Sequence, residues 1–150
     1  MSDLRELYQE VILDHSKHPK NYHKMPDATH IAEGFNPLCG DHFYIYLKVE
    51  DGVIKDISFE GAGCAISKAS ASIMTSMVKG KTIEEAEKIF NEFHLFVTDK
   101  ADKDFDPNSL GKLAVFSGVS EFPVRVKCAT LAWHTLINAL KNKNEVASTE

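Results

Sequence analysis

The chain has 150 residues, of which 43% are hydrophobic and 26% are charged, and its formal net charge at pH 7 is -5. This composition is typical of a soluble globular protein and excludes fibrous and disordered classes. The acidic balance argues against binding to nucleic acid or to an anionic membrane, because both need clustered positive charge. No apolar run approaches about 18 residues and the N-terminus has no signal-peptide pattern, so we interpret the protein as cytoplasmic.

A helix and a β-hairpin are the first expected elements. From residue 3 to about 16, apolar residues recur at the spacing of an amphipathic helix: Leu4, Leu7, Tyr8, Val11 and Ile12. Residues 43 to 49 alternate between apolar and polar, and a looser alternation resumes after Asp51-Gly52. This pattern predicts a hairpin, because Asp-Gly suits the positive φ angles of a type I′ turn. A weaker pattern over about residues 28 to 35 indicates a third strand.

Two helices are expected after the hairpin. The first covers about residues 67 to 78 and ends at Gly80, a favourable residue just beyond a helix. The second opens at Thr82, which stands three residues before Glu85 in the arrangement of a capping box. It continues to about Phe93.

A last long helix follows a polar, acidic connection over residues 97 to 112. It runs from Pro123, well placed at a first helical position, to about Lys141, with Trp133 on its buried stripe. The tail from about residue 142 is expected to be flexible. The whole pattern predicts one α+β domain over residues 1–150, with a small antiparallel sheet and helices packed on one face.

Each of the three cysteines lies at a junction between expected elements. Cys39 precedes the first clear strand with Asp41 two residues on, and two such positions of an extended segment point to the same side. Cys64 lies between a strand and a helix, and Cys128 lies in the second turn of the last helix, at the margin of its buried stripe. Three thiolates and one carboxylate make a full tetrahedral zinc set, and nearby glycines permit close backbone approach. Their spacing alone leaves open three separate buried thiols.

Three motifs around these cysteines resemble those of the IscU/NifU-type iron-sulfur cluster assembly proteins: "NPLCGDHF", "FEGAGCAISKASASIMT" and "FPVRVKCATLAWHTL". The match extends from "LYQEVILDHSKHPKN" to about Lys141. The resemblance implies an α+β sandwich in which the three cysteines converge at one exposed end. It also implies that the zinc or cluster ligands are Cys39, Asp41, Cys64 and Cys128.

Departures from the IscU pattern favour the SufU branch of this family. IscU scaffolds have a histidine directly before the third cysteine, where this chain has Lys127, and a chaperone-docking Leu-Pro-Pro-Val-Lys segment, where this chain has "EFPVRVK". The acidic connection before Cys128 is also longer than in IscU. Resemblance to SufU implies a zinc-dependent sulfurtransferase. Such a protein accepts persulfide sulfur from a SufS-like cysteine desulfurase and relays it to downstream scaffold proteins.

We expect Cys39 to accept the sulfur, because its turn is the most exposed of the three by sequence context. A saturated zinc site hides its nucleophile, so one ligand must leave, and the hypothesis is that a partner group such as a histidine replaces Cys39. Two alternatives stay open. One is a scaffold on which a [2Fe-2S] cluster is assembled and transferred, with Asp41 as the labile ligand. The other is a non-catalytic module stabilised by zinc.

Histidines and basic residues near these motifs have simpler interpretations. His42 adjoins the proposed site but points away from Asp41 on an alternating strand. Four histidines are interpreted as surface or turn residues: His15, His18, His23 and His30. For His15, which belongs to the family-like N-terminal motif, the alternative is that it packs the N-terminal helix against the domain. Arg125 and Lys127 either orient a persulfide or bind a partner, or they are solvated helix charges.

Overall fold

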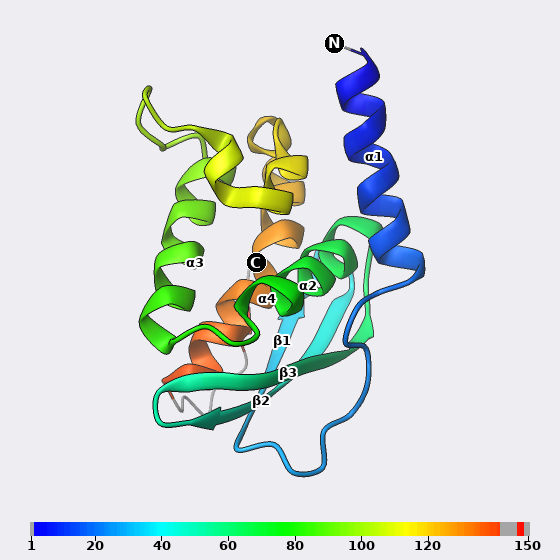
Figure 1. Ribbon diagram of the computed structural model, residues 1–150. Helices are drawn as coiled ribbons and strands as arrows, with labels where there is room; N and C mark the ends of the chain where they lie inside the picture. Colours follow the sequence, from blue (N-terminus) through cyan, green and yellow to red (C-terminus); the bar gives the residue numbers. More distant parts are fainter. Residues whose placement is uncertain (1, 142–146, 149–150) are drawn as a thin grey trace.

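A four-stranded sheet forms one layer of the protein, with the strand order β3-β2-β1-β4 (Figure 1). The computed structural model describes residues 2–141 and 147–148. Strands β1 (His30–Asn36), β2 (Asp41–Glu50) and β3 (Val53–Ala62) are antiparallel neighbours, and β4 (Ala147–Ser148) pairs in parallel with β1. The expected antiparallel strands are therefore confirmed, but the parallel edge strand was not expected. The rest of the predicted flexible tail lies outside the described residues.

The hairpin between β2 and β3 forms as its sequence predicts. Asp51 and Gly52 both have positive φ angles, 53° and 73°, as a type I′ turn requires. Along β2 the alternating residues Phe43, Ile45 and Leu47 are fully buried, while Tyr44 between them is exposed. One face of the sheet is thus apolar and faces the core, and the other carries polar and aromatic side chains.

Helices cover the apolar face of the sheet (Figure 1). Helices α2 (Ala65–Val78) and α4 (Pro123–Leu140) pack on the sheet and on each other, α3 (Ile83–Val97) packs against α4, and α1 (Ser2–Lys17) packs along α2. The expected α+β architecture is confirmed. The capping box of Thr82 and Glu85 is present at the start of α3. Helix α2 begins two residues earlier than expected, because Cys64 is its N-cap residue.

The connection before α4 is more ordered than its polar sequence indicates. Two short 3₁₀ segments, η1 (Pro107–Phe116) and η2 (Val119–Glu121), follow α3. Within η1, Leu110, Leu113 and Phe116 are buried, and the Phe116 ring packs edge-on against Phe93 of α3 with their centroids 5.8 Å apart. Segments this short have no long hydrophobic period, so periodicity does not reveal them.

The core lies between the sheet and α2 and α4 and extends to α3 and η1. Its largest fully buried side chains are aromatic and include Trp133, as expected: Trp133, Phe43, Phe59, Phe93 and Phe116. At about 25 cal/mol per Å² of apolar surface removed from water, such residues dominate the stability of the fold. This core is independent of any metal.

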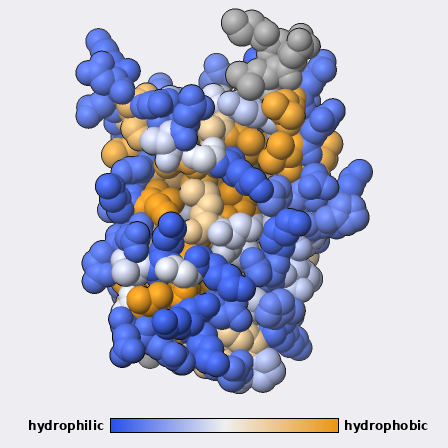
Figure 2. All heavy atoms as spheres, viewed as in Figure 1, coloured by the Kyte–Doolittle hydropathy of each residue, from blue (hydrophilic) through white to orange (hydrophobic). Residues whose placement is uncertain are grey.

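A surface pocket of about 680 Å³ opens between α1 and the start of α4. Tyr8 and Ile12 line one side, and Val119 and Phe122 line the other. Figure 2 shows hydrophobic residues exposed on this side of the protein, beside α1. Within the described part of the chain, no helix is both long and apolar enough to cross a membrane.

Candidate functional site

The four candidate residues come from four junctions at one end of the sheet. Cys39 lies in the loop of residues 37–40 between β1 and β2, and Asp41 is the first residue of β2. Cys64 follows β3 and caps α2, while Cys128 lies in the second turn of α4. Cys39 and Asp41 are two residues apart in the chain, and the pairing of β2 with β3 brings Cys64 to the same end of the sheet. The packing of α4 on β1 and β2 brings Cys128 there as well.

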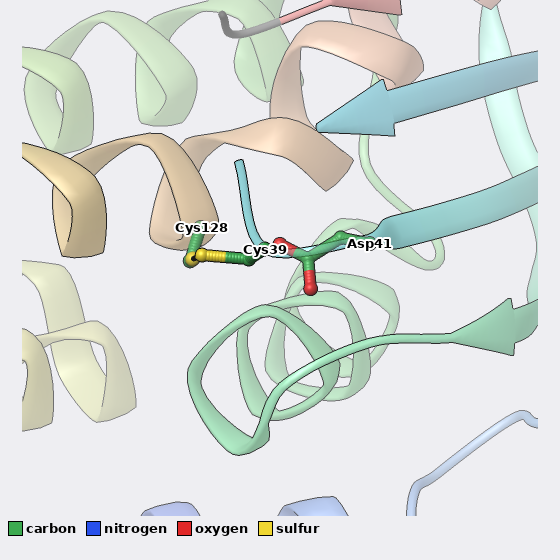
Figure 3. A group of neighbouring side chains, drawn as sticks. All are labelled: Cys39, Asp41 and Cys128. Atoms are coloured by element: carbon green, nitrogen blue, oxygen red, sulfur yellow. Dashed lines mark hydrogen bonds between the residues drawn. The ribbon is translucent and has the colours of Figure 1, made fainter. Parts of the chain in front are cut away.

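Three of the four candidate ligands form a close group. Atoms of the Cys39 thiol, the Asp41 carboxylate and the Cys128 thiol all lie within 4.8 Å of one another. Figure 3 shows the thiols of Cys39 and Cys128 directed at each other, with the Asp41 side chain beside Cys39. The Sγ atoms of Cys39 and Cys128 are 3.1 Å apart, and all three cysteines are free thiols. Cys64 lies outside this group of three, but its backbone N–H donates to Asp41 and its thiol interacts with that of Cys128.

Asp41 is a fully buried carboxylate with a donor on each oxygen. The backbone N–H of Cys64 donates to Oδ1 at 2.8 Å, and the side-chain amide of Asn36 donates to Oδ2 at 3.0 Å. A buried carboxylate is tolerable only when such donors replace the water it has lost. These two bonds fix both the position and the rotation of the carboxylate.

Asn36 is a site residue that the sequence analysis missed. It is fully buried at the end of β1, directly opposite Asp41 in the β1–β2 register. Its Nδ2 group also lies 3.6 Å from Cys128 Sγ as a donor. The sequence does contain a signal for Asn36, because this polar residue continues the two-residue spacing of the inward-facing positions Ala32 and Gly34. A polar side chain on the core face of a strand marks a site where it has partners.

Cys64 is placed as a thiolate at the N-terminus of a helix. Its Sγ accepts from the backbone N–H of Ser67 at 3.4 Å, so the thiol does the work of an N-cap side chain. The pKa of Cys64 is lowered to about 6, chiefly by a hydrogen bond from Cys128, against the opposing effect of burial, and further by Ser67. Without a metal, Cys64 is therefore largely ionised at neutral pH.

Cys128 keeps its proton under the same conditions. Its pKa is raised far above the ordinary value by its hydrogen bond to Cys64, by burial and by its contact with Cys39. A thiol has one proton, so Cys128 donates to Cys64 or to Cys39 at any moment but not to both. Cys128, expected at the margin of the buried stripe, is only 2% exposed and contacts Asn36 and Cys39 at the end of the sheet. Cys39 and Cys64 are half-buried.

Two glycines let the end of β3 approach the site. A Cβ atom on Gly61 would lie 2.1 Å from the carbonyl oxygen of His42, and Gly61 has a φ of +136°. A Cβ on Gly63 would lie 2.7 Å from Asp41 Oδ1 and 2.5 Å from Ser67 Oγ. Both positions exclude larger residues, as the sequence analysis inferred from the glycines around Cys64.

The other residues singled out from the sequence lie apart from the four candidates. His42 is on the outer face of the sheet, as expected, with Nε2 2.5 Å from Glu33 Oε2. Of the two interpretations of His15, packing of the N-terminal helix is confirmed and a surface position is wrong, because His15 is buried with Nδ1 2.7 Å from Ser72 Oγ, between α1 and α2. Arg125 lines the surface pocket and lies over the Phe122 ring, and Lys127 is half-buried.

The donor set fits a zinc ion in chemical terms. In a tetrahedral site with zinc–sulfur bonds of about 2.3 Å, ligand atoms are about 3.5 to 3.8 Å apart. The close group of Cys39, Asp41 and Cys128 already lies within 4.8 Å, and Asn36 donates to two of its members, as donors around anionic ligands do. Soft thiolates favour zinc or iron-sulfur clusters over calcium or magnesium.

Comparison with known proteins gives a consistent family. A sequence model of the NifU-like N terminal domain matches residues 7–142. The chain is 44% identical over 135 residues to the "Iron-sulfur cluster assembly scaffold protein IscU" of Thermotoga maritima, covering 90% of this chain and 93% of that protein. It is 41% identical over 139 residues to the "Zinc-dependent sulfurtransferase SufU" of Bacillus subtilis, covering 90% of each.

The fold has close relatives among solved structures. A crystal structure described as a putative iron-sulfur cluster assembly scaffold protein for the SUF system of Fervidobacterium islandicum superposes with a TM-score of 0.82. Its sequence is 39% identical, and the match covers 90% of this chain and 97% of that one. The likeness in sequence and the likeness in fold therefore extend over the same length of chain.

Proposed function

This chain belongs to the family of NifU-like N-terminal domains, and we propose that it is a zinc-dependent sulfur acceptor of the SufU type. In this proposal a SufS-like cysteine desulfurase supplies persulfide sulfur, and the protein relays it to downstream scaffold proteins for iron-sulfur cluster assembly. The observation that carries the proposal is the close group of two thiols and a carboxylate at the end of the sheet, with the Cys64 thiolate beside it.

We propose Cys39, Asp41, Cys64 and Cys128 as the zinc ligands. Bound zinc would keep these thiols deprotonated at neutral pH without bringing redox chemistry of its own. The metal-free fold already favours the charged forms of two of these ligands, because Cys64 is largely ionised and both oxygens of Asp41 accept hydrogen bonds. Cys128 is the residue whose proton the protein alone does not remove.

We assign the acceptor role to Cys39, because the other three candidates are held more firmly. Asp41 has a donor on each oxygen, Cys64 caps α2, and Cys128 is buried within α4. Cys39 lies instead in a short loop, with its thiol half-buried against Cys128. A loop residue moves at lower cost than a residue within a packed helix.

The transfer step resembles thiol–disulfide exchange, and its atoms and electrons all come from the two proteins. The Cys39 thiolate attacks the terminal sulfur of the desulfurase persulfide, and a new sulfur–sulfur bond forms at Cys39. The bond between that sulfur and the desulfurase cysteine breaks, and its electron pair stays on the desulfurase as a thiolate. No external oxidant or reductant is consumed.

The choice of the SufU branch rests on residues around the third cysteine. Lys127 stands where the IscU pattern has a histidine, so a histidine ligand is absent at that position. The SufU relative is named as zinc-dependent, which agrees with a three-cysteine, one-aspartate set. Thiols of this reactivity persist in a reducing compartment, so we expect the protein to work in the cytoplasm.

A cluster scaffold is the second candidate, favoured by the 44% identity to a protein named as an IscU scaffold. In that role a [2Fe-2S] cluster is the cargo, and the same four residues hold it until transfer. A carboxylate at one corner binds iron less firmly than a thiolate, which suits release. The third possibility, a passive zinc module, predicts unfolding when the metal is removed.

Desulfurase turnover of cysteine separates these functions. The enzyme is assayed with the zinc-loaded protein, with the chelated protein and with the protein anaerobically loaded with iron and sulfide. Strong stimulation by the zinc-loaded form alone supports the sulfur acceptor. No stimulation by the zinc-loaded or the chelated form, together with a stable cluster on the iron-loaded protein, favours the scaffold. Circular dichroism of the chelated form shows whether the fold survives without metal, as its own core predicts.

A further inference from the structure

Asn36 and Asp41 close the base of the loop that carries Cys39. The two residues are the last partners in the β1–β2 register, and residues 37–40 form the loop between them. The side chain of Asn36 is fully buried on the core side of β1. From there it reaches both Asp41 of β2 and Cys128 of α4.

We propose that Asn36 is a positioning residue that ties Asp41 to Cys128 and so leaves Cys39 as the ligand that moves. This inference rests on the proposed function of the site. The Nδ2 group lies 3.0 Å from Asp41 Oδ2 and 3.6 Å from Cys128 Sγ. An amide nitrogen has two protons, so one Asn36 side chain donates to both acceptors at once.

The orientation of the amide supports this assignment. The Oδ1 atom of Asn36 is buried and has no hydrogen-bond partner among the described residues, whereas Nδ2 has two acceptors. A side chain that served only to complete hydrogen bonds in the core would have partners at both ends. The donors of the amide are instead directed toward Asp41 and Cys128, the two proposed ligands whose charged forms such donors would stabilise once zinc is bound.

The consequence is a division of the site into a fixed part and a movable part. Asp41 is held by Asn36 and by the Cys64 backbone, and Cys128 is held by Asn36 and by its helix. Cys39 lies in the loop between β1 and β2 and takes part in none of the hydrogen bonds made by Asn36 or by the Cys64 backbone. Opening the loop at Cys39 therefore leaves the relative positions of Asp41 and Cys128 unchanged, which keeps the remaining ligands in place during sulfur transfer.

The test compares Asn36→Ala with Ser72→Ala, both in the full-length protein. Ser72 is a fully buried residue whose hydroxyl contacts His15 and accepts from the backbone of Lys20, so its loss removes one buried and one partly buried hydrogen bond elsewhere. Zinc affinity is measured by competition with a chromophoric chelator, and folding by thermal unfolding of the metal-free proteins. We expect Asn36→Ala to weaken zinc binding about 10- to 100-fold, as loss of a hydrogen-bonded neighbour of a ligand does. Ser72→Ala should leave zinc binding unchanged.

The order of thiol alkylation is the second readout, and a purely structural role would not change it. In the zinc-loaded parent protein, iodoacetamide followed by peptide mass spectrometry should label Cys39 first. In Asn36→Ala, Cys128 should become reactive together with Cys39. An Asn36→Ala protein that folds, binds zinc as tightly as the parent and keeps the parental order of labelling would overturn the proposal.

The unaltered protein provides a measurement that needs no variant. In protein labelled with ¹⁵N and loaded with ¹¹³Cd in place of zinc, the side-chain amide protons of Asn36 should be protected from exchange and coupled to the metal through Cys128 Sγ. Rapidly exchanging, uncoupled protons would contradict the proposal. If the parent protein binds neither metal, the proposed function itself fails. If the parent binds metal and Asn36 makes no difference, only the role of Asn36 fails.

Discussion

Replacing Gly63 by alanine places a methyl group against the buried carboxylate of Asp41. The added Cβ would lie 2.7 Å from Asp41 Oδ1, 2.5 Å from Ser67 Oγ and 3.0 Å from the ring of Phe43. Asp41 and Phe43 are fully buried, so neither moves freely. The carboxylate must shift, which weakens the bond that it accepts from the Cys64 N–H.

The expected cost has two parts. Crowding of a packed site and the loss of one charged hydrogen bond together destabilise the metal-free protein by about 2 to 4 kcal/mol. Displacement of a ligand carboxylate should weaken zinc binding by at least about 10-fold, since the loss of its hydrogen-bonded neighbours alone has that effect. Urea unfolding of the metal-free protein measures the first quantity, and chelator competition measures the second.

Gly80→Ala is the matched control for Gly63→Ala. Gly80 follows the other end of α2, has a φ of +85° and has no atom within 4 Å of an added Cβ. Alanine there strains the backbone by about 1 to 2 kcal/mol without crowding any side chain. It should lower stability and leave zinc affinity unchanged. A folded Gly63→Ala protein with parental zinc affinity would refute the placement of Asp41 beside Gly63 in the metal site.

Two titrations follow from the perturbed groups. In metal-free protein, ultraviolet absorbance should show one thiolate forming with a pKa of about 6. Cys64→Ser should abolish this titration. Cys128→Ala should raise the pKa of the Cys64 thiol, because the hydrogen bond from Cys128 is the main cause of its shift. A low-pKa thiolate that persists in Cys64→Ser would assign it to another cysteine. His134 has its pKa lowered from 6.5 by burial and by nearby His94, so the folded state binds fewer protons than the unfolded state. The stability associated with neutral His134 is present above pH 6.5 and is lost as the pH falls below that value. His134→Phe should therefore flatten the pH dependence of the free energy of unfolding below pH 6.5, as measured by urea unfolding. His15, whose pKa burial also lowers, leaves a residual slope of the same sign; an unchanged slope in His134→Phe would exclude His134 as its source.

Elements with a strong local signal were predictable from the sequence. The Asp51-Gly52 hairpin and the Thr82 capping box each depend on the chemistry of a few adjacent residues, and both form as expected. The family also followed from three motifs spread over most of the chain, and the comparisons confirm it. The ligand and acceptor roles of the cysteines and of Asp41 stay predictions, to be tested with metal and desulfurase.

Features that depend on distant contacts were not predictable. Strand β4 has two residues and exists only because it pairs with β1, and the buried side chains of η1 follow no long period. The hydroxyl that His15 contacts belongs to Ser72 of α2, 57 residues away. The role of Asn36 was missed for the same reason, since it depends on a contact with Cys128, 92 residues further along the chain. Tertiary contacts of this kind leave only a weak trace in the local sequence.

The location of the transferred sulfur is the most direct test of the sulfur-acceptor proposal. Desulfurase, cysteine and zinc-loaded protein are mixed, the reaction is trapped by alkylation, and the persulfide is mapped by peptide mass spectrometry. The proposal predicts a persulfide on Cys39 that disappears in Cys39→Ser, while that variant keeps its fold. Sulfur that accumulates on Cys64 or Cys128 in the parent protein, or full sulfur acceptance by Cys39→Ser, would contradict it.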